Sequence, residues 1–176
     1  MIFLGIGSNL SSSFGNKIDN INLSISLLKE NKIEVSKISS FYQSQAFPNK
    51  NDPMFINIVV EVNTLLRPKD LIITLLKIEE KLERKRLKKN APRTCDIDII
   101  DYKREKININ FESLQLQIPH KSLTHRNFVL YPLKEICPNW YHPLTNSSID
   151  LLINNLKNKN NGITKLSQSD IKCYVE

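Results

Sequence analysis

The stretch MFINIVVEVNT, residues 54–64, has the alternating pattern of a β-strand with two different faces. Successive side chains of a strand point to opposite sides of a sheet. One face is wholly aliphatic and consists of Ile56, Ile58, Val60 and Val62. The other face is mixed and consists of Phe55, Asn57, Val59 and Glu61. The pattern predicts a strand whose aliphatic side packs on helices.

The mixed face carries an aromatic ring and an amide two residues apart. Such a pair suits a flat heterocycle, because the ring offers a stacking surface and the amide can donate and accept in one plane. Two simpler interpretations stay open. Phe55, like Phe128 further along, fits ordinary core packing, and Asn57 fits a satisfied polar group at a strand edge.

Strands and helices alternate on both sides of this stretch. The expected elements are strands at 2–6, 32–44 and 94–102, two short strands around a turn within 107–120, and helices at about 15–30, from Pro68 onward and at about 148–157. A Pro- and Asn-rich loop is expected at 45–53. The predicted fold class is α/β (α+β), with one sheet flanked by helices.

Length and composition predict a single domain over residues 1–176, with a loose polar tail from about residue 155. The apolar runs are too short for a membrane span, and the N-terminus lacks the pattern of a signal peptide. The cysteines, Cys95, Cys137 and Cys173, fit neither a zinc site nor a disulfide framework. We therefore expect a protein of the reducing cytoplasm.

The net charge is +7, and much of the excess lies in residues 81–93, KLERKRLKKNAPR. A basic stretch of this kind predicts an anionic partner, either a nucleic acid or a phosphorylated small molecule. It fits equally well a solvated helix end, where the helix dipole favours cations.

The segment APRTCDIDII, residues 91–100, places two carboxylates in an apolar strand. Residues two apart share a face and lie about 6.6–6.8 Å apart along it, so Asp96 and Asp98 point the same way. The opposite face consists of Cys95, Ile97 and Ile99, which should point toward the core. Paired carboxylates can bind divalent cations that clamp a transferring phosphoryl group, and Mg²⁺ suits such ligands. The alternative is a solvated strand face that happens to carry Asp.

The surroundings of the aspartate pair favour a polyphosphate ligand. Arg93 and the basic stretch directly precede the pair, so cations and carboxylates gather in one segment. Metal ions on the carboxylates and arginines beside them can together hold the oxygens of a polyphosphate. The sequence has no Gly-x-x-x-x-Gly-Lys-[Ser/Thr] motif, so a P-loop enzyme is excluded.

These motifs resemble the 6-hydroxymethyl-7,8-dihydropterin pyrophosphokinase family. APRTCDIDII resembles its Pro-Arg-x-x-Asp-x-Asp signature. The other segments that agree in order and spacing are GIGSNL at 5–10, SSFYQS at 39–44 with PMFIN at 53–57, and IPHKSLTHRNFVLYPL at 118–133. The match covers roughly residues 1–145, and the ordered motifs are together far more specific than any one alone.

The resemblance implies a reaction and a fold. The diphosphate of ATP would move to the hydroxymethyl group of a reduced pterin, with release of AMP, as a step of folate synthesis. A ferredoxin-like fold, two Mg²⁺ ions and a cytoplasmic monomer are also implied. ATP and 6-hydroxymethyl-7,8-dihydropterin would be the ligands, with no nucleic acid and no membrane as partners.

The resemblance also implies site residues. The metal ligands would be Asp96 and Asp98. The catalytic set would be Arg84, Arg86, Arg93, Asp96 and Asp98. The pterin-binding set would be Ser44, Phe47, Phe55, Asn57 and Phe128. The ATP-binding set would be Glu79, Arg84, Arg93, Ile99, His120 and Arg126.

Several positions depart from the family pattern. They are Asn90 in place of Trp, Lys121 in place of an aromatic residue, Ala91 in place of Gly, and Gln45-Ala46 in place of a Pro-rich pair. We expect residues 84–91 to form a mobile lid over ATP. Without the Trp, its closure should depend on charge more than on packing.

A second class of function is a basic RNA- or DNA-binding module on a ferredoxin-like sheet. The positive charge and the Phe-bearing strands allow it. The aromatic residues do not form the interleaved Lys/Arg-Gly-Phe signature of an RNA-recognition sheet, and an aspartate pair would repel phosphate without a metal. Metal-dependent stabilisation by an ATP analogue would separate the two classes.

Overall fold

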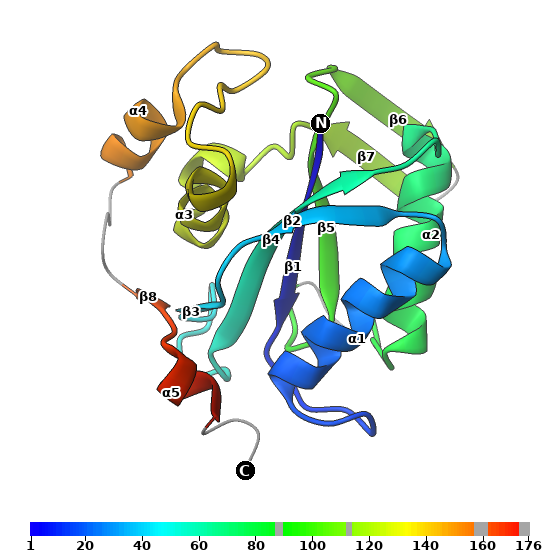
Figure 1. Ribbon diagram of the computed structural model, residues 1–176, viewed down its shortest axis with the longest axis vertical. Coiled ribbons are helices and arrows are strands. Elements are labelled where there is room, and N and C mark those ends of the chain that lie inside the picture. The colour runs from blue at the N-terminus through cyan, green and yellow to red at the C-terminus, as the bar shows by residue number, and fades with distance from the viewer. Residues whose placement is uncertain (87–89, 112–113, 157–161, 173–176) are drawn as a thin grey trace.

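The computed structural model describes residues 1–86, 90–111, 114–156 and 162–172, and a six-stranded sheet forms its centre (Figure 1). The strands are β1 (Ile2–Ser8), β2 (Glu34–Ile38), β3 (Tyr42–Ser44), β4 (Phe55–Asn63), β5 (Asp96–Tyr102) and β8 (Ile163–Lys165). Their order is β5–β1–β4–β3–β8, and β2 pairs with β4 on the edge that β3 also uses. Every pairing in this sheet is antiparallel.

Helices cover the two faces of the sheet unequally (Figure 1). The helices are α1 (Lys17–Glu30), α2 (Pro68–Lys81), α3 (Asn127–Ile136), α4 (Ile149–Asn154) and α5 (Gln168–Lys172), with a short 3₁₀ turn η1 (Leu123–His125). Helices α1 and α2 lie on one face, and α3 packs on the other. The β–α–β–β–α–β order and the strand order confirm the predicted ferredoxin-like class.

A separate two-stranded sheet joins β6 (Ile107–Phe111) to β7 (Leu114–Ile118). It confirms the predicted pair of short strands, and it adds a small second sheet to the single one expected. Its strand β7 also contacts β5. The two-stranded sheet therefore lies next to the strand that carries the aspartate pair.

The starts of the two long helices follow from local sequence. The Asn16 side chain accepts hydrogen bonds from the first turn of α1, and the Asp19 carboxylate accepts one from the Asn16 N–H, which completes a capping box. Helix α2 begins at Pro68, whose fixed φ suits a first helical position. Both helices begin close to the predicted residues.

Two hydrophobic cores lie on opposite sides of the sheet. The first core packs the aliphatic face of β4 against α1 and α2, and it contains Ile56, Ile58, Val60 and Val62 as predicted. Cys95, Ile97 and Ile99 also point into it, as predicted. The second core packs Phe3, Val59 and Ile100 against α3 and α4. Part of the second face is thus left for polar and aromatic side chains.

The strand predicted over 32–44 is interrupted, and this expectation was wrong. The chain forms β2 and β3 with a break between them, because Ser39 bonds the Val59 backbone with its side chain as well as its own N–H. Ser40 then turns to Glu135 of α3, which accepts from its N–H and hydroxyl. The polar tail, which we expected to be loose, includes strand β8 and helix α5.

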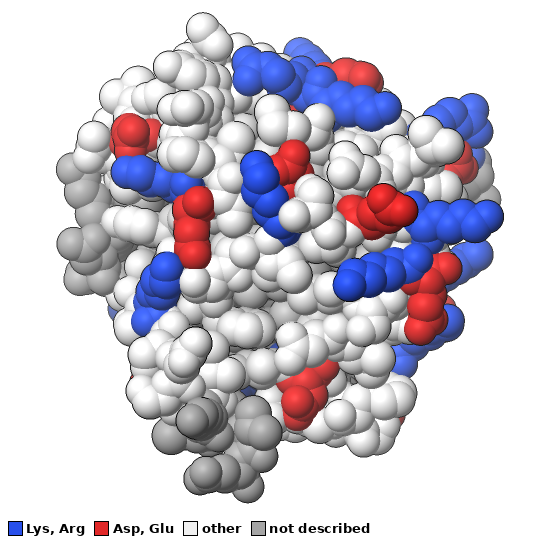
Figure 2. Space-filling model, viewed as in Figure 1, with Lys and Arg blue, Asp and Glu red and all other residues white. Residues whose placement is uncertain are grey.

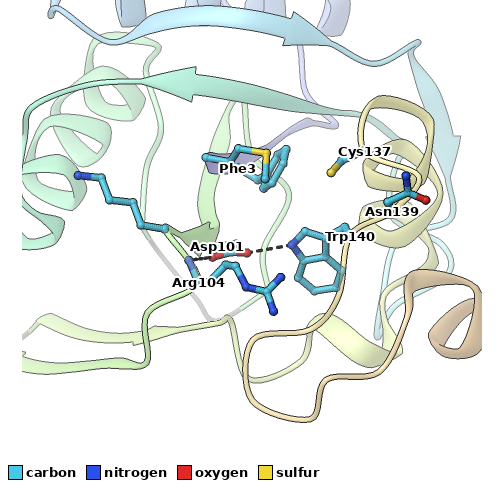
Figure 3. A pocket seen from close by; sticks show the side chains of 8 residues that line it. Phe3, Asp101, Arg104, Cys137, Asn139 and Trp140 are labelled. Carbon is cyan, nitrogen blue, oxygen red and sulfur yellow. Dashed lines mark hydrogen bonds between the residues drawn. The ribbon is translucent and has the colours of Figure 1, made fainter.

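A small cavity lies where β5 ends, away from the aspartate pair (Figure 3). Its volume is about 160 Å³, and Phe3, Asp101 and Trp140 lie in its wall. The Asp101 carboxylate accepts from Trp140 Nε1 at 2.9 Å and from the Arg104 N–H at 2.8 Å. Both oxygens of this buried carboxylate are therefore engaged by neutral donors.

Charge on the face shown in Figure 2 is mixed. Basic side chains lie next to acidic ones in several places, and uncharged residues cover much of that face. Ion pairs in the structure include Lys37–Glu61 at 2.9 Å and Lys134–Asp150 at 2.5 Å. In the part of the chain that the structure describes, no helix has the length and apolarity needed to cross a bilayer.

Candidate active site

The aspartate pair, Asn57 and Phe55 come together around the end of β1. In the sheet register, Gly7 lies between Asn57 of β4 and Asp96 of β5, and Gly5 lies between Val59 and Asp98. A Cβ added to Gly7 would lie 3.0 Å from Asn57 Oδ1. Strand β1, which lies between β4 and β5, must therefore have no side chain at position 7, so that the Asn57 amide can extend over it. The motif GIGSNL was the signal for this role.

Arginines from three different segments engage the aspartate pair. Asp96 pairs with Arg84 at 2.5 Å and with Arg93 at 3.3 Å, while Asp98 pairs with Arg126 at 2.9 Å. The side chains of Asp96 and Asp98 are 26% and 39% exposed, so both can be reached from solvent. Five predicted site residues thus lie in one cluster, hereafter the Asp–Arg cluster.

Glu79 lies behind this cluster rather than on the open face. It is 2% exposed on α2, and its carboxylate accepts from the Ile97 N–H at 2.7 Å. It also pairs with Arg84 and Arg86. Burial raises the pKa of Glu79 to about 7, against the lowering effect of Arg84. Glu79 therefore accepts a hydrogen bond from the Ile97 N–H of β5. It also orients Arg84, which in turn pairs with Asp96.

The predicted lid, residues 84–91, falls partly outside the described residues, which omit 87–89. Within the described part, Arg84 is only 9% exposed at its side chain, so it is fixed by Glu79 and Asp96. Arg86 is 59% exposed and reaches Glu79 from the surface. Arg84 thus belongs to the Asp–Arg cluster, and Arg86 lies at its outer edge.

Among the predicted pterin residues, Asn57 and Ser44 contact each other directly. Asn57 Nδ2 donates to Ser44 Oγ at 2.9 Å and to the Tyr42 carbonyl at 3.4 Å. These bonds fix the orientation of the amide, whose Oδ1 lies over Gly7. Phe47 is 81% exposed in the loop after β3 and does not join this group.

The two candidate stacking rings each face a guanidinium of the Asp–Arg cluster. Arg93 Cζ lies 5.3 Å from the centre of the Phe55 ring, and Arg126 Cζ lies 5.6 Å from that of Phe128. Such cation–π contacts are attractive. Phe128 also packs against the second core. Each ring therefore lies directly beside a cation that contacts an aspartate of the pair.

The remaining ATP-site candidates lie on and beside β5. Burial lowers the pKa of His120, which favours the neutral ring. Its Nδ1 accepts from the Ser122 N–H at 3.1 Å, which leaves the proton on Nε2, where it can be donated. The side chain of Ile99 is in the first core, so its backbone is what can meet a ligand.

Asn9 is a site-building residue that the sequence did not reveal by itself. Its Oδ1 accepts from the Arg93 N–H at 2.7 Å, and its Nδ2 donates to the Pro53 carbonyl at 3.0 Å. The backbone N–H of Asn9 donates to the Arg93 carbonyl. One side chain thus joins the segments that lead into β4 and β5. Its place in GIGSNL was the available signal.

Arginines and paired carboxylates on a ferredoxin-like sheet define a phosphoryl-transfer enzyme of the kind that does not use a P-loop. Residues 3–138 match the family described as 7,8-dihydro-6-hydroxymethylpterin-pyrophosphokinase (HPPK). The chain belongs to this family. Its activity is the transfer of diphosphate from ATP to hydroxymethyldihydropterin in folate biosynthesis.

Individual relatives agree with this assignment. The chain is 39% identical over 143 residues to the 2-amino-4-hydroxy-6-hydroxymethyldihydropteridine pyrophosphokinase of Aquifex aeolicus, covering 81% of this chain and 84% of that one. The enzyme of the same name from Synechocystis is 40% identical over 151 residues, covering 85% and 73%. The solved wild-type HPPK-DHPS of Plasmodium falciparum with pteroate has a TM-score of 0.68 at 17% identity, covering 87% of this chain and 43% of that one, which supports the fold.

Proposed function

We propose that this diphosphate transfer depends on Mg²⁺ ions and that Asp96 and Asp98 bind them. The chemistry of the donors fits, since carboxylate oxygens on a partly exposed strand face are the ligands that Mg²⁺ prefers. Among the described residues, no group of three or more His, Cys, Asp or Glu is arranged to hold a metal ion. The other ligands would therefore be phosphate oxygens and water. When bound, the metal ions neutralise phosphate charge and polarise the bond that breaks.

The arginines of the Asp–Arg cluster would hold the phosphates of ATP. Arg84, Arg93 and Arg126 contact the aspartates with single Nη atoms, so each keeps other N–H donors for a ligand. The buried Nε of Arg93 has no hydrogen-bond partner among the described residues. An unpaired buried donor is costly, and a phosphate oxygen would satisfy it.

The pterin would lie between Phe55 and Phe128, with Asn57 at its edge. Each ring now faces an arginine, and a flat heterocycle could take that place while the arginine moves to phosphate. The Asn57 amide is held by Ser44, so its free oxygen can accept from a pterin N–H in a defined direction. Holding both substrates in one geometry is the main source of rate in such transfers.

Transfer would occur at the β-phosphorus of ATP. The pterin hydroxyl would form the new O–P bond as the bond between the β-phosphorus and the oxygen bridging to the α-phosphorus breaks, so AMP leaves. Arg84 and Arg86 would stabilise the charge that develops on the transferring group. We also propose that residues 1–176 act as one domain and as a monomer in the cytoplasm.

Product analysis tests the proposal most directly. The protein is incubated with ATP, MgCl₂ and 6-hydroxymethyl-7,8-dihydropterin, and nucleotides are separated by chromatography. We expect AMP to appear in step with pterin diphosphate, and chelation of Mg²⁺ to stop both. Formation of ADP instead would show monophosphoryl transfer, and full activity in the presence of chelator would remove the metal role.

A further inference from the structure

The strand β8 lies outside the segment that matches the family, yet it touches the pterin side of the proposed site. The family match ends at residue 138, whereas β8 is Ile163–Lys165. Strand β8 pairs with β3 along its whole length, with Tyr42 opposite Lys165 and Ser44 opposite Ile163 (Figure 1). The Gln45 N–H also donates to the Gly162 carbonyl at 3.0 Å. Ser44 therefore lies between β4 and β8.

Strand β8 is anchored on both faces of the sheet. Leu166, directly after it, is buried in the first core, and its N–H donates to the Phe41 carbonyl at 2.9 Å. On the other face, the Lys165 ammonium pairs with Glu135 of α3 at 3.2 Å. The same carboxylate accepts from the Tyr42 hydroxyl at 2.8 Å. These contacts hold β8 and β3 together as one unit.

We propose that β8 positions the pterin-binding residues, so that this C-terminal segment determines affinity for the pterin. Strand β3 has three residues, and without β8 it would be a short edge strand, which opens easily. Ser44 Oγ is the partner that orients the Asn57 amide. When β3 moves, Asn57 loses that partner, and the heterocycle loses its polar contact. The inference rests on the proposed pterin site at Asn57.

A matched pair of proline substitutions can release β8 from β3. Hydrogen bonds from the Leu166 N–H to Phe41 and from the Gln45 N–H to Gly162 fix the alternation of the ladder. The Thr164 N–H therefore points to β3, whereas the Lys165 N–H points away from it. Both residues are exposed. Thr164→Pro removes a ladder hydrogen bond. Lys165→Pro places the same ring at the adjacent residue and keeps the ladder hydrogen bonds, but it also removes the partly exposed ion pair with Glu135.

Each variant is assayed for the KM of the pterin and for the Kd of a non-hydrolysable ATP analogue without pterin. We expect Thr164→Pro to raise the pterin KM about tenfold, equivalent to ~1.4 kcal/mol, with the Kd of the ATP analogue changed less than about twofold. Lys165→Pro should raise the pterin KM by about threefold or less. Hydrogen exchange of the β3 amides should quicken in Thr164→Pro alone.

Several outcomes would overturn the positioning role. One is an unchanged pterin KM in Thr164→Pro, and another is an equal loss of pterin and ATP-analogue affinity, which would show general damage. If Thr164→Pro does not fold, Leu166→Ala weakens the anchor of β8 and must raise the pterin KM in the same selective way. Asn57→Ala in the same assay separates the two proposals. If Asn57→Ala leaves the pterin KM unchanged, the error lies in the proposed pterin site and not in the attachment of β8 to β3.

Discussion

Strand β5 carries carboxylates at both of its ends, and these carboxylates differ in exposure and in their hydrogen-bond partners. Near its start, Asp96 and Asp98 are partly exposed and are engaged by arginines of the Asp–Arg cluster. Near its end, Asp101 is 1% exposed and accepts from the neutral donors of Trp140 and Arg104. A buried carboxylate that has fixed donors stabilises the fold. A carboxylate that is partly exposed and paired with arginines stays accessible to a metal ion.

The difference also shows in what surrounds each end. The Asp101 end is closed by Trp140, next to a cavity of about 160 Å³ (Figure 3). The other end is flanked by Gly7, which contributes no side chain, and by rings that face arginines. Enclosure alone is therefore a poor guide to the candidate site in this protein. The chemistry of the partners favours the open end as that site.

The largest effect is expected from removing a carboxylate at the open end of β5. We expect Asp98→Ala to lower kcat by at least ~100-fold, because a metal ligand beside the transferring phosphate is lost. The free energy of unfolding should change by no more than ~1 kcal/mol, since the Asp98–Arg126 pair is partly exposed. Steady-state kinetics and urea titration measure the two effects. Near-normal kcat at ordinary Mg²⁺ would contradict the metal assignment.

The reverse result is expected at the closed end. Asp101→Ala leaves the buried Trp140 indole N–H and the part-buried Arg104 N–H without their acceptor, and it should cost ~2–4 kcal/mol of the free energy of unfolding. At a temperature where the variant is folded, kcat/KM should stay within about twofold. Trp140→Phe is the milder control, because it removes one donor only. A stable Asp101→Ala protein that has lost turnover would reverse the roles of the two ends.

The aromatic residues near the two ends of β5 should also differ in their roles, with Phe128 in substrate binding and Trp140 in the fold. Phe128→Ala should weaken pterin binding about tenfold, or ~1.4 kcal/mol, and should leave the Kd of an ATP analogue alone nearly unchanged. The ring is proposed to stack on the pterin, while Trp140 serves the fold. Calorimetric titration of Phe128→Ala and Trp140→Phe gives both affinities. Loss of ATP affinity with normal pterin affinity would mean that the two substrate sites are interchanged.

Glu79 lies between the two cases, and its contribution to stability should depend on pH. It is buried like Asp101 and pairs with arginines like Asp96. Its pKa is raised to about 7 from 4.5, so the folded protein holds more protons than the unfolded chain between those pH values. The stability that Glu79 contributes should therefore fall as pH rises through this window, by at most ~1.4 kcal/mol per pH unit.

The measurement for Glu79 is a comparison of wild type with Glu79→Gln by urea unfolding from pH 4.5 to pH 7. The free energy of unfolding of wild type minus that of the variant should decrease as pH rises. A flat or rising difference would show that Arg84 and Arg86 keep Glu79 ionised despite its burial.

Local pattern predicted a large part of the fold. The alternation in 54–64 identified β4 and its core face, and helical spacing with Pro68 identified α2. The break between β2 and β3 was not predictable, because it depends on Ser39 and Ser40 bonding to Val59 and Glu135, which are distant in the chain. Strand β8 was also missed. Its three residues are too few to form a strand pattern, and the strand exists only through its pairing with β3.

The candidate site was predictable as a set of residue types and only partly as an arrangement. The motif around Asp96 and Asp98 indicated metal and phosphate chemistry, and parity correctly placed the aspartates opposite Ile97. The burial of Glu79 and the exposure of Phe47 were not indicated by any local feature. For Asn9, which joins the segments before β4 and β5, the place in GIGSNL was the available signal.

Sequence periodicity and short motifs were sufficient for the strands and helices, the aliphatic faces and the paired carboxylates, because these depend on neighbours within a few residues. The difference between the ends of β5 arises from tertiary structure. The register shifts between Phe3 and Leu4, so Ile100 has no partner on β1 and Asp101 lies opposite Phe3. This bulge turns Asp101 toward Trp140, on the sheet face that also carries Asp98. A bulge depends on the pairing of two distant strands, and that pairing exists only once the chain has folded.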